Sequence, residues 1–186
     1  MNIATKRLEI TTVIGCKIAC RSCPQGTLLK AYGKKDRPRI LTMDGFRQLL
    51  SQVDTDVMIC FAGMSEPWGN PACTDMVEYA VKKGHPVSAY TTLVGWTQED
   101  VTRLKQIHFA EFVLHLPDQK GNANIPVTEE YLSLLKQVVE QKQTDRLTVT
   151  GLSCHGDVDP RVAAYVPKHI FLSRELNDQG GGHAAG

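Results

Sequence analysis

The sequence predicts an α/β fold, a partial (β/α)6 barrel made of a parallel sheet with outer helices. Two observations support this prediction. First, six short apolar runs alternate with helix-like segments along the 186 residues, and strands joined by helices form right-handed parallel crossovers. Second, the run Asp56–Ala62 is almost continuously apolar, as expected for a parallel strand that is buried on both faces. A twisted sheet of six such strands closes only partly toward a barrel.

The first half of the chain contains three of the predicted strands. Leu8–Ile14 is the first strand, and Asp56–Ala62 is the second. The basic stretch Lys30–Arg39, with its internal glycine and proline, is predicted to be an exposed loop. The remaining elements of this half are a helix capped by Thr42 and ending at Val53, a helix over Thr74–Lys83 that stops at Gly84, and a third strand over Val87–Thr92.

The second half repeats the alternation of helices and strands. Threonines at two helix starts have the side chain that an N-cap position prefers. The expected elements are a helix capped by Thr97 and ending near Ile107, a strand over Glu111–Leu116, a helix from Thr128 to Gln143, a strand over Arg146–Leu152, a short helix or turn over Pro160–Tyr165, and a sixth strand over His169–Leu172.

Composition limits the class of protein. Apolar residues make up 42% of the chain and charged residues 22%, which is typical of a globular protein. A net charge of +1 predicts neither a broad nucleic-acid surface nor a membrane-binding one. There is no long apolar run and no signal peptide, so a cytoplasmic location is expected. Residues 1–176 are predicted to form one core domain, and the glycine-rich residues 177–186 a flexible tail.

An open flavodoxin-like or Rossmann-like sheet is the alternative fold for the same pattern. The chain contains neither G-x-G-x-x-G nor G-x-x-x-x-G-K-[ST]. These are the glycine-rich turns with which such folds bind nucleotide phosphates. The partial barrel is therefore preferred.

Three cysteines lie within eight residues, at Cys16, Cys20 and Cys23. Their C-x3-C-x2-C spacing lets three thiols face one small object from a single loop. A closed structural zinc site takes four protein ligands, and no further Cys or His lies nearby at zinc-like spacing. A 4Fe–4S cluster held by three cysteines keeps one iron open to an outside ligand. The alternative is a set of chance or buried cysteines, or a disulfide pair and an odd thiol.

A second motif, Phe61-Ala62-Gly63-Met64-Ser65-Glu66-Pro67, follows the second strand. A carboxylate and backbone carbonyls in a tight turn can accept hydrogen bonds from an ammonium group. With the cysteine triplet one β/α unit earlier, this segment resembles the radical S-adenosylmethionine (radical SAM) superfamily. The resemblance extends to the strand and helix order over most of the chain. It departs at Ser65, where the family pattern usually has glycine.

The resemblance implies a TIM-like partial barrel, a 4Fe–4S cluster on the three cysteines, and S-adenosyl-L-methionine on the open iron. An electron from the cluster would cleave this cofactor to methionine and a 5′-deoxyadenosyl radical, which abstracts hydrogen from a substrate. Glu66 is expected to accept the cofactor's amino group, with Gly63 and Ser65 beside it in the turn.

Further candidate residues lie where the later strands end. Thr91 and Thr92 end the third strand, and His115 and Asp118 lie at the end of the fourth. Because barrel sites are built at the carboxyl ends of strands, these four are expected to contact the cofactor. Alternatively, Thr91 and Thr92 are strand residues that pack the core, and Asp118 belongs to a turn-rich connection. His155, after the fifth strand, could be a substrate ligand, a proton relay or a structural residue. No catalytic side chain is assigned.

The resemblance also implies partners. An electron donor such as flavodoxin or ferredoxin is expected, with a small molecule, peptide or natural-product scaffold as substrate. The Cys23-Pro24-Gln25 continuation resembles the SPASM-related branch, although the C-terminal cysteine-rich extension of that branch is missing here. The chain is therefore expected to be a minimal enzyme, or to have its barrel covered by a partner subunit or a missing C-terminal domain.

Two other functions fit the same motifs. One is an activating enzyme that abstracts hydrogen from a glycine of a partner protein. The other is a non-catalytic regulatory protein in which the triplet binds zinc or a sensing cluster.

Overall fold

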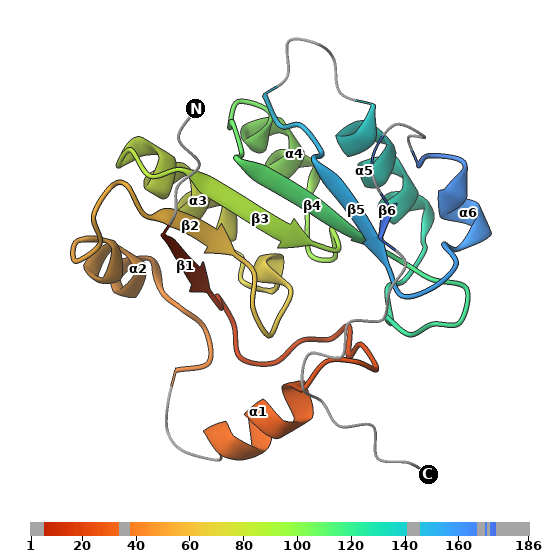
Figure 1. Cartoon of the computed structure of the whole chain (residues 1–186), viewed down its shortest axis with the longest axis horizontal. Coiled ribbons are helices and arrows are strands. Elements are labelled where there is room, and N and C mark those ends of the chain that lie inside the picture. Colours follow the sequence, from red (N-terminus) through yellow and green to blue (C-terminus); the bar gives the residue numbers. More distant parts are fainter. Residues whose placement is uncertain (1–5, 34–37, 141–145, 167–169, 171, 174–186) are drawn as a thin grey trace.

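The computed structural model describes residues 6–33, 38–140, 146–166, 170 and 172–173. It contains one sheet of six strands in the order β1-β2-β3-β4-β5-β6 (Figure 1). Each strand pairs in parallel with the next, and within the described residues β1 and β6 do not pair. The predicted partial (β/α)6 barrel is therefore confirmed. The strands are β1 (Arg7–Ile10), β2 (Met58–Phe61), β3 (Val87–Thr91), β4 (Glu111–Leu116), β5 (Gly151–Cys154) and β6 (Leu172–Ser173).

Helices follow the strands as outer crossovers. Figure 1 shows α3, α4 and α5 behind one face of the sheet, while α1 stands apart beyond the ends of the strands. The helices are α1 (Gln25–Tyr32), α2 (Met43–Leu50), the short 3-10 helix η1 (Pro67–Gly69), α3 (Cys73–Lys82), α4 (Gln98–Leu104), α5 (Glu129–Val139) and α6 (Pro160–Ala163).

The predicted helix caps are present. The hydroxyls of Thr42, Thr97 and Thr128 each accept a hydrogen bond from a backbone N–H in the first turn of their helices. At Thr97 the bond is reciprocal, because the carboxylate of Asp100 accepts from the Thr97 backbone N–H. These bonds satisfy N–H groups that have no partner within the helix.

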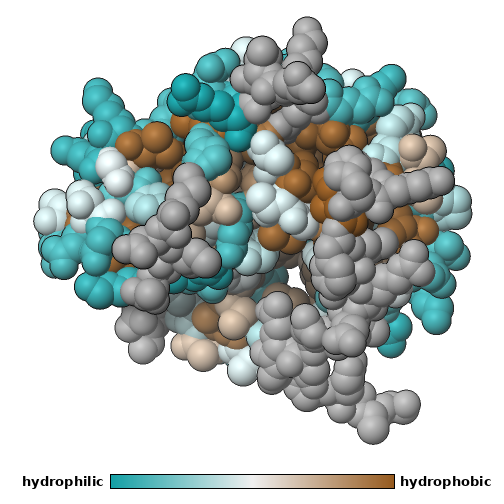
Figure 2. Space-filling model, turned by 45° about the horizontal axis from the view of Figure 1, so that its top comes forward, coloured by the Kyte–Doolittle hydropathy of each residue, from teal (hydrophilic) through white to brown (hydrophobic). Residues whose placement is uncertain are grey.

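The core lies between the sheet and the outer helices. Along β4, Phe112, Leu114 and Leu116 are at most 1% exposed, whereas the alternate residues Glu111, Val113 and His115 are partly exposed. Side chains alternate between the faces of a strand, so the second set lies on the face away from the helices. In Figure 2, hydrophilic side chains occupy most of the outline, with hydrophobic patches between them.

Several predicted boundaries are wrong. Residues 30–32, expected in a loop, belong to α1, which starts after Pro24 and has no side-chain cap that would signal it. The fifth strand begins at Gly151 rather than Arg146, because Arg146 donates its N–H to the carbonyl of Lys105 outside the sheet. β1 ends at Ile10, and the carbonyl of Thr12 accepts from Leu41 and Asn70 instead. The proposed tail, residues 177–186, lies outside the described residues.

Among the described residues, no helix has the length and apolar character needed to cross a membrane.

Candidate functional site

A cavity of about 330 Å³ opens at the carboxyl ends of the strands. It brings together the cysteine loop, the turn after β2 and the ends of β3, β4 and β5. Of the predicted site residues, all but Asp118 line this cavity. They are Cys16, Cys20, Cys23, Gly63, Ser65, Glu66, Thr91, Thr92 and His115, together with His155.

The three cysteines of the loop are free thiols of intermediate burial. Burial, together with the neighbouring Cys16 and Cys23, raises the pKa of Cys20 to about 12. A thiolate at Cys20 is therefore costly unless a cation accompanies it. The backbone N–H of Glu66 donates to the Cys16 sulfur at 3.4 Å, which ties the cysteine loop to the turn after β2. Within the described residues, no three His, Cys, Asp or Glu side chains converge closely enough to hold one metal ion. A cubane differs from a single ion, because each thiol binds its own iron.

Gln25 links the cysteine loop to the turn after β2. Its side-chain oxygen accepts from the Cys16 backbone N–H at 2.9 Å, and its amide nitrogen donates to the Met64 carbonyl at 2.6 Å. The residue is only 7% exposed. Sequence reasoning missed this role, although a polar residue two positions after the triplet could have indicated it. Gln25 thus fixes the loop and the turn relative to each other.

The turn itself requires glycine at position 63. Gly63 has φ +96°, and a Cβ atom there would collide with the hydroxyl of Thr11. Only glycine adopts this conformation without strain. Ser65, two residues later, has a buried hydroxyl oxygen with no partner. The turn therefore combines a close backbone approach with an unsatisfied polar group at the cavity.

The Glu66 carboxylate accepts four hydrogen bonds. Oε1 accepts from the Thr91 hydroxyl at 2.5 Å and the Trp68 backbone N–H at 3.3 Å. Oε2 accepts from the backbone N–H and the hydroxyl of Thr92, both at 2.7 Å. A carboxylate offers about four lone-pair sites, so all of them are used. Burial raises the pKa of Glu66, and these four donors oppose the shift.

The direction of the Thr91 hydrogen bond follows from its other partners. The Thr91 oxygen already accepts from the Leu93 backbone N–H at 3.0 Å and from Trp96 Nε1 at 3.2 Å. Both of its lone pairs are occupied, so its proton must point to Glu66. Glu66 is thereby surrounded by donors only, which suits its ionised form. No cationic side chain of the described residues forms an ion pair with it.

Leu93 takes the left-handed conformation, with φ +64°. A side chain in this conformation costs about 1 kcal/mol relative to glycine. Leu93 is 2% exposed, and burying its side chain offsets this cost.

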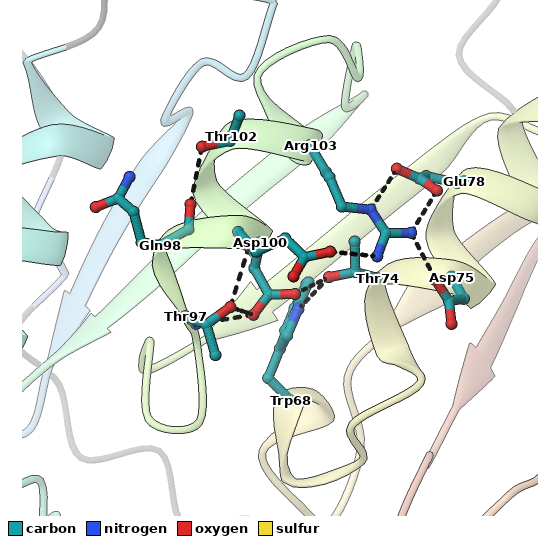
Figure 3. A network of polar contacts seen from close by, with 10 residues as sticks. Trp68, Thr74, Asp75, Glu78, Thr97, Gln98, Asp100, Thr102 and Arg103 are labelled. Atoms are coloured by element: carbon teal, nitrogen blue, oxygen red, sulfur yellow. Dashed lines mark hydrogen bonds and ion pairs between the residues drawn. The ribbon is translucent and has the colours of Figure 1, made fainter.

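A polar network supports the turn from behind (Figure 3). Trp68 Nε1 donates to the Thr74 hydroxyl at 2.9 Å, and Thr74 donates to Asp100 at 2.5 Å. Arg103 of α4 then bridges to Asp75 and Glu78 of α3. The Trp68 ring also packs on Trp96, with centroids 4.4 Å apart. These contacts attach η1, and therefore Glu66, to the outer helices.

Two histidines from neighbouring strands meet in the same cavity. The rings of His115 and His155 have centroids 4.4 Å apart. His115 Nδ1 is 2.8 Å from the Ser153 hydroxyl, and His155 Nε2 is 3.3 Å from the Ser22 hydroxyl in the cysteine loop. Burial lowers the pKa of His115 to about 4, with His155 adding to the effect, and burial also lowers the pKa of His155. His115 Nε2 and His155 Nδ1 are buried without a partner.

Asp118 has a different environment from the one predicted. It is 5% exposed and does not line the cavity. Its carboxylate accepts from the backbone N–H groups of Lys120, Asn122 and Ala123 and from the Asn122 side chain. Burial opposes ionisation, but these donors hold the pKa of Asp118 below its usual range. Its own loop therefore uses the carboxylate, and the expected contact of Asp118 with a cofactor stays a prediction.

The loop that Asp118 organises holds the cysteine loop in place. The Asn122 carbonyl accepts from the Arg21 N–H at 2.7 Å, and the Asn124 N–H donates to the Ile18 carbonyl at 3.0 Å. The cysteine loop contains Ala19 in the left-handed conformation, with φ +47°. These bonds help to maintain that conformation.

The arrangement has two kinds of binding group in one cavity. One side offers three thiols, which suit soft metals and iron–sulfur clusters. The adjacent turn offers a buried carboxylate without a cationic partner, together with the unpaired Ser65 hydroxyl. The site can therefore hold a cluster beside a small cationic molecule.

No protein-family model and no curated protein matches this sequence. Among solved structures, the chain is similar to the crystal structure of BtrN in complex with AdoMet and 2-DOIA, with a TM-score of 0.55 and 16% sequence identity. The match covers 83% of this chain and 58% of that one, so the chain spans less than two thirds of the BtrN structure. At this identity the similarity shows a common fold.

Proposed function

We propose that this chain is a radical SAM enzyme, in which Cys16, Cys20 and Cys23 hold a 4Fe–4S cluster and the adjacent cavity binds S-adenosyl-L-methionine. The observation that carries the proposal is that one cavity contains the three thiols and the buried carboxylate of Glu66, which forms no ion pair with any described residue. When bound, the cluster and cofactor supply a 5′-deoxyadenosyl radical that abstracts hydrogen from a substrate. The AdoMet bound in the BtrN structure, which has a similar fold, supports this proposal.

The thiols fit such a cluster. Three rather than four cysteines leave one iron free for an outside ligand. The cluster would supply the positive charge that makes deprotonated cysteines favourable in this partly buried loop, and assembly would release their protons. The Glu66 N–H at the Cys16 sulfur is an outer hydrogen bond of the kind that tunes cluster properties.

Glu66 acts on the cofactor mainly through its charge. S-adenosyl-L-methionine carries an ammonium and a sulfonium group, and an ionised carboxylate with no cation nearby attracts both. All lone-pair sites of Glu66 are used internally, so a direct bond to the ammonium would replace one of them. The weakest is the 3.3 Å bond from the Trp68 N–H. The unpaired Ser65 hydroxyl supplies a further polar contact in the same turn.

Other parts of the proposal concern the partners. The electron donor is a flavodoxin or ferredoxin, and the substrate is a small molecule or a peptide or natural-product scaffold, as in the SPASM-related branch. A partner subunit or a C-terminal domain covers the barrel. Tyr90 lies on the face of the sheet away from the helices, is partly exposed and lines the cavity, so a bound substrate would meet it there.

Anaerobic reconstitution with iron and sulfide tests the function. We expect a brown protein with about four irons that converts S-adenosyl-L-methionine to 5′-deoxyadenosine after reduction with dithionite. A Cys16, Cys20, Cys23 triple alanine variant should lose both properties. A Cys60→Ala variant is the matched control, because Cys60 is buried and does not line the cavity.

Two outcomes would contradict the proposal. One is a colourless protein that binds zinc at the triplet and cleaves no cofactor, which indicates the regulatory alternative. The other is full cofactor cleavage in the triple variant. Hydrogen abstraction from a glycine of a stably bound large protein would instead identify an activating enzyme.

A further inference from the structure

The inner face of the sheet, which we define as the face away from the helices, carries charged side chains below the cavity. Along β1, Leu8 and Ile10 pack into the core, so the alternate residues Arg7 and Glu9 lie on the inner face. Glu111 lies on the same face at the start of β4. Because the cavity opens at the carboxyl ends of the strands, these residues lie beneath it.

An ion pair crosses the inner face. Arg7 Nη2 lies 2.6 Å from Glu111 Oε2, although β2 and β3 separate their two strands. The Tyr90 hydroxyl donates to the same Glu111 oxygen at 2.9 Å, and Tyr90 also lines the cavity. We call these three side chains the floor of the cavity. The floor pairs the guanidinium group of Arg7 with Glu111.

Glu9 is the acidic residue of the inner face that the floor leaves unpaired. It is exposed, and it forms no ion pair or hydrogen bond with another described residue. Its Oε1 lies 3.4 Å from the position that a Cβ atom on Gly63 would occupy. Gly63 lines the cavity, so the free carboxylate of Glu9 lies at the edge of the cavity.

A buried hydroxyl on the same face also lacks a partner. Ser88 is 0% exposed, and its side-chain oxygen has no hydrogen-bond partner. It lies two residues before Tyr90 and therefore on the same face, and in the sheet it is paired with Cys60 and Glu111. A buried hydroxyl without a partner is costly, and most such groups in proteins are satisfied. The inner face thus offers both a free carboxylate and a free hydroxyl.

The charges of the site favour a cation and disfavour an acid. Among the described residues, no Lys or Arg lines the cavity. The inner face has one positive residue, Arg7, and two negative ones, Glu9 and Glu111. Arg7 is already paired, so a carboxylate or phosphate would find no free cation there. The oxygens of Glu9 can accept charge-assisted hydrogen bonds from an ammonium group.

We infer that Glu9 anchors an ammonium group of the substrate, and that the substrate is therefore a small primary amine rather than an acid. This inference rests on the proposed function and names the substrate class of the same site. The rest of the amine extends from Glu9 past Tyr90 toward the cavity. The hydroxyl of Ser88 provides a further hydrogen-bonding group on this face.

Three probes with the same ring separate the effect of charge from the effect of shape. Cyclohexylamine, cyclohexanol and cyclohexanecarboxylate are cationic, neutral and anionic at pH 7. Their dissociation constants are measured by ligand-observed NMR on the reconstituted holoprotein with saturating S-adenosyl-L-methionine, which occupies the site beside Glu66. The variants are Glu9→Gln and Glu9→Lys. Glu129→Gln is the matched control, because Glu129 is an exposed glutamate on α5.

The native protein and the control should bind cyclohexylamine at least about fivefold more tightly than cyclohexanol, and cyclohexanecarboxylate most weakly. Glu9→Gln should remove the advantage of the amine, and Glu9→Lys should make the carboxylate the tightest of the three probes. Thermal unfolding shows whether each variant folds, and Glu9→Gln alone decides the result where Glu9→Lys does not fold.

Three results would overturn the inference. They are no binding of cyclohexylamine, equal binding of cyclohexylamine and cyclohexanol by the native protein, and an advantage of the amine that persists in Glu9→Gln. Binding of S-adenosyl-L-methionine is measured first by calorimetry. Its absence would count against the proposed function instead, and the three probes are then compared without it.

Discussion

Replacing Glu66 with glutamine is the most informative single change in the site. The amide has the shape of the carboxylate but carries two donors in place of one oxygen. Every neighbour of Glu66 is a donor, and the Thr91 hydroxyl cannot turn around because Leu93 and Trp96 occupy its lone pairs. Either orientation of the amide therefore leaves an NH2 group facing the backbone N–H of Thr92 or of Trp68.

The cost follows from the bonds lost. Each orientation removes about two hydrogen bonds to a charged acceptor, and such bonds contribute about 1.5–3 kcal/mol each. The variant no longer buries a charge, which offsets part of this loss. We expect Glu66→Gln to lower the free energy of unfolding by about 3 kcal/mol. For a chain of this size, that corresponds to a decrease in Tm of roughly 6–12 °C.

Urea unfolding of the metal-free protein, followed by circular dichroism, measures this change. Glu99→Gln is the matched control. Glu99 is 77% exposed and lies 3.6 Å from Arg103, so its replacement should change the free energy by less than about 1 kcal/mol. A Glu66→Gln variant as stable as the control would refute the assignment of Glu66 as an ionised acceptor of four hydrogen bonds.

Three further predictions concern other parts of the cavity. Asp118→Ala should lower the free energy of unfolding by about 3 kcal/mol. It should also speed hydrogen exchange of the Arg21 amide, because the loop whose carbonyl accepts this N–H loses its organising carboxylate. Unchanged exchange at Arg21 would contradict this prediction. His115 in the folded protein has a pKa of about 4 against an ordinary 6.5. Below pH 6.5 the unfolded chain therefore binds a proton at this residue before the folded protein does, and the free energy of unfolding decreases as the pH falls toward 4. His115→Gln should therefore reduce the loss of stability between pH 7 and 4.5 by roughly 2.5 kcal/mol in urea titrations. Gln25→Leu should lower the free energy of unfolding by about 2 kcal/mol and reduce iron incorporation, because it leaves the Cys16 N–H unpaired. Normal iron content in this variant would argue against the linking role of Gln25.

The order of most elements could be predicted because most of the strands and helices have a local signal. The continuous apolar run of β2 and the cap threonines at 42, 97 and 128 are legible within a few residues. α1 has no capping side chain, so its start carried no such signal. The region before β5 contains buried Leu147 and Val149, which gave it a strand-like pattern. Its first residue, Arg146, bonds to Lys105 outside the sheet, whereas Thr150, next to β5, bonds to Phe112 of β4.

The site residues likewise divide into those that a local sequence signal predicts and those that only long-range contacts bring together. The cysteine triplet is local, and its spacing alone indicated a cluster. The links around it are long-range: Gln25 reaches Met64, and Glu66 reaches Thr91 and Thr92. The meeting of His115 and His155 depends on the pairing of β4 with β5, in which His115 is opposite Ser153. No sequence spacing encodes these contacts, because they arise only when the sheet forms.

The two buried carboxylates show why residue type and sequence position were insufficient to predict which side chain faces a bound cofactor. Both Glu66 and Asp118 follow a strand, and sequence reasoning gave both to the cofactor. Asp118 receives its donors from the five residues that follow it, and its pKa lies below the usual range. Its charge is therefore already stabilised, and an added cation would gain little. Glu66 lies on the cavity wall, takes its strongest donors from another strand, and has a raised pKa. A cation bound beside Glu66 would relieve that unfavourable burial, so the proposed ligand is expected beside Glu66, whereas the Asp118 carboxylate organises its own loop.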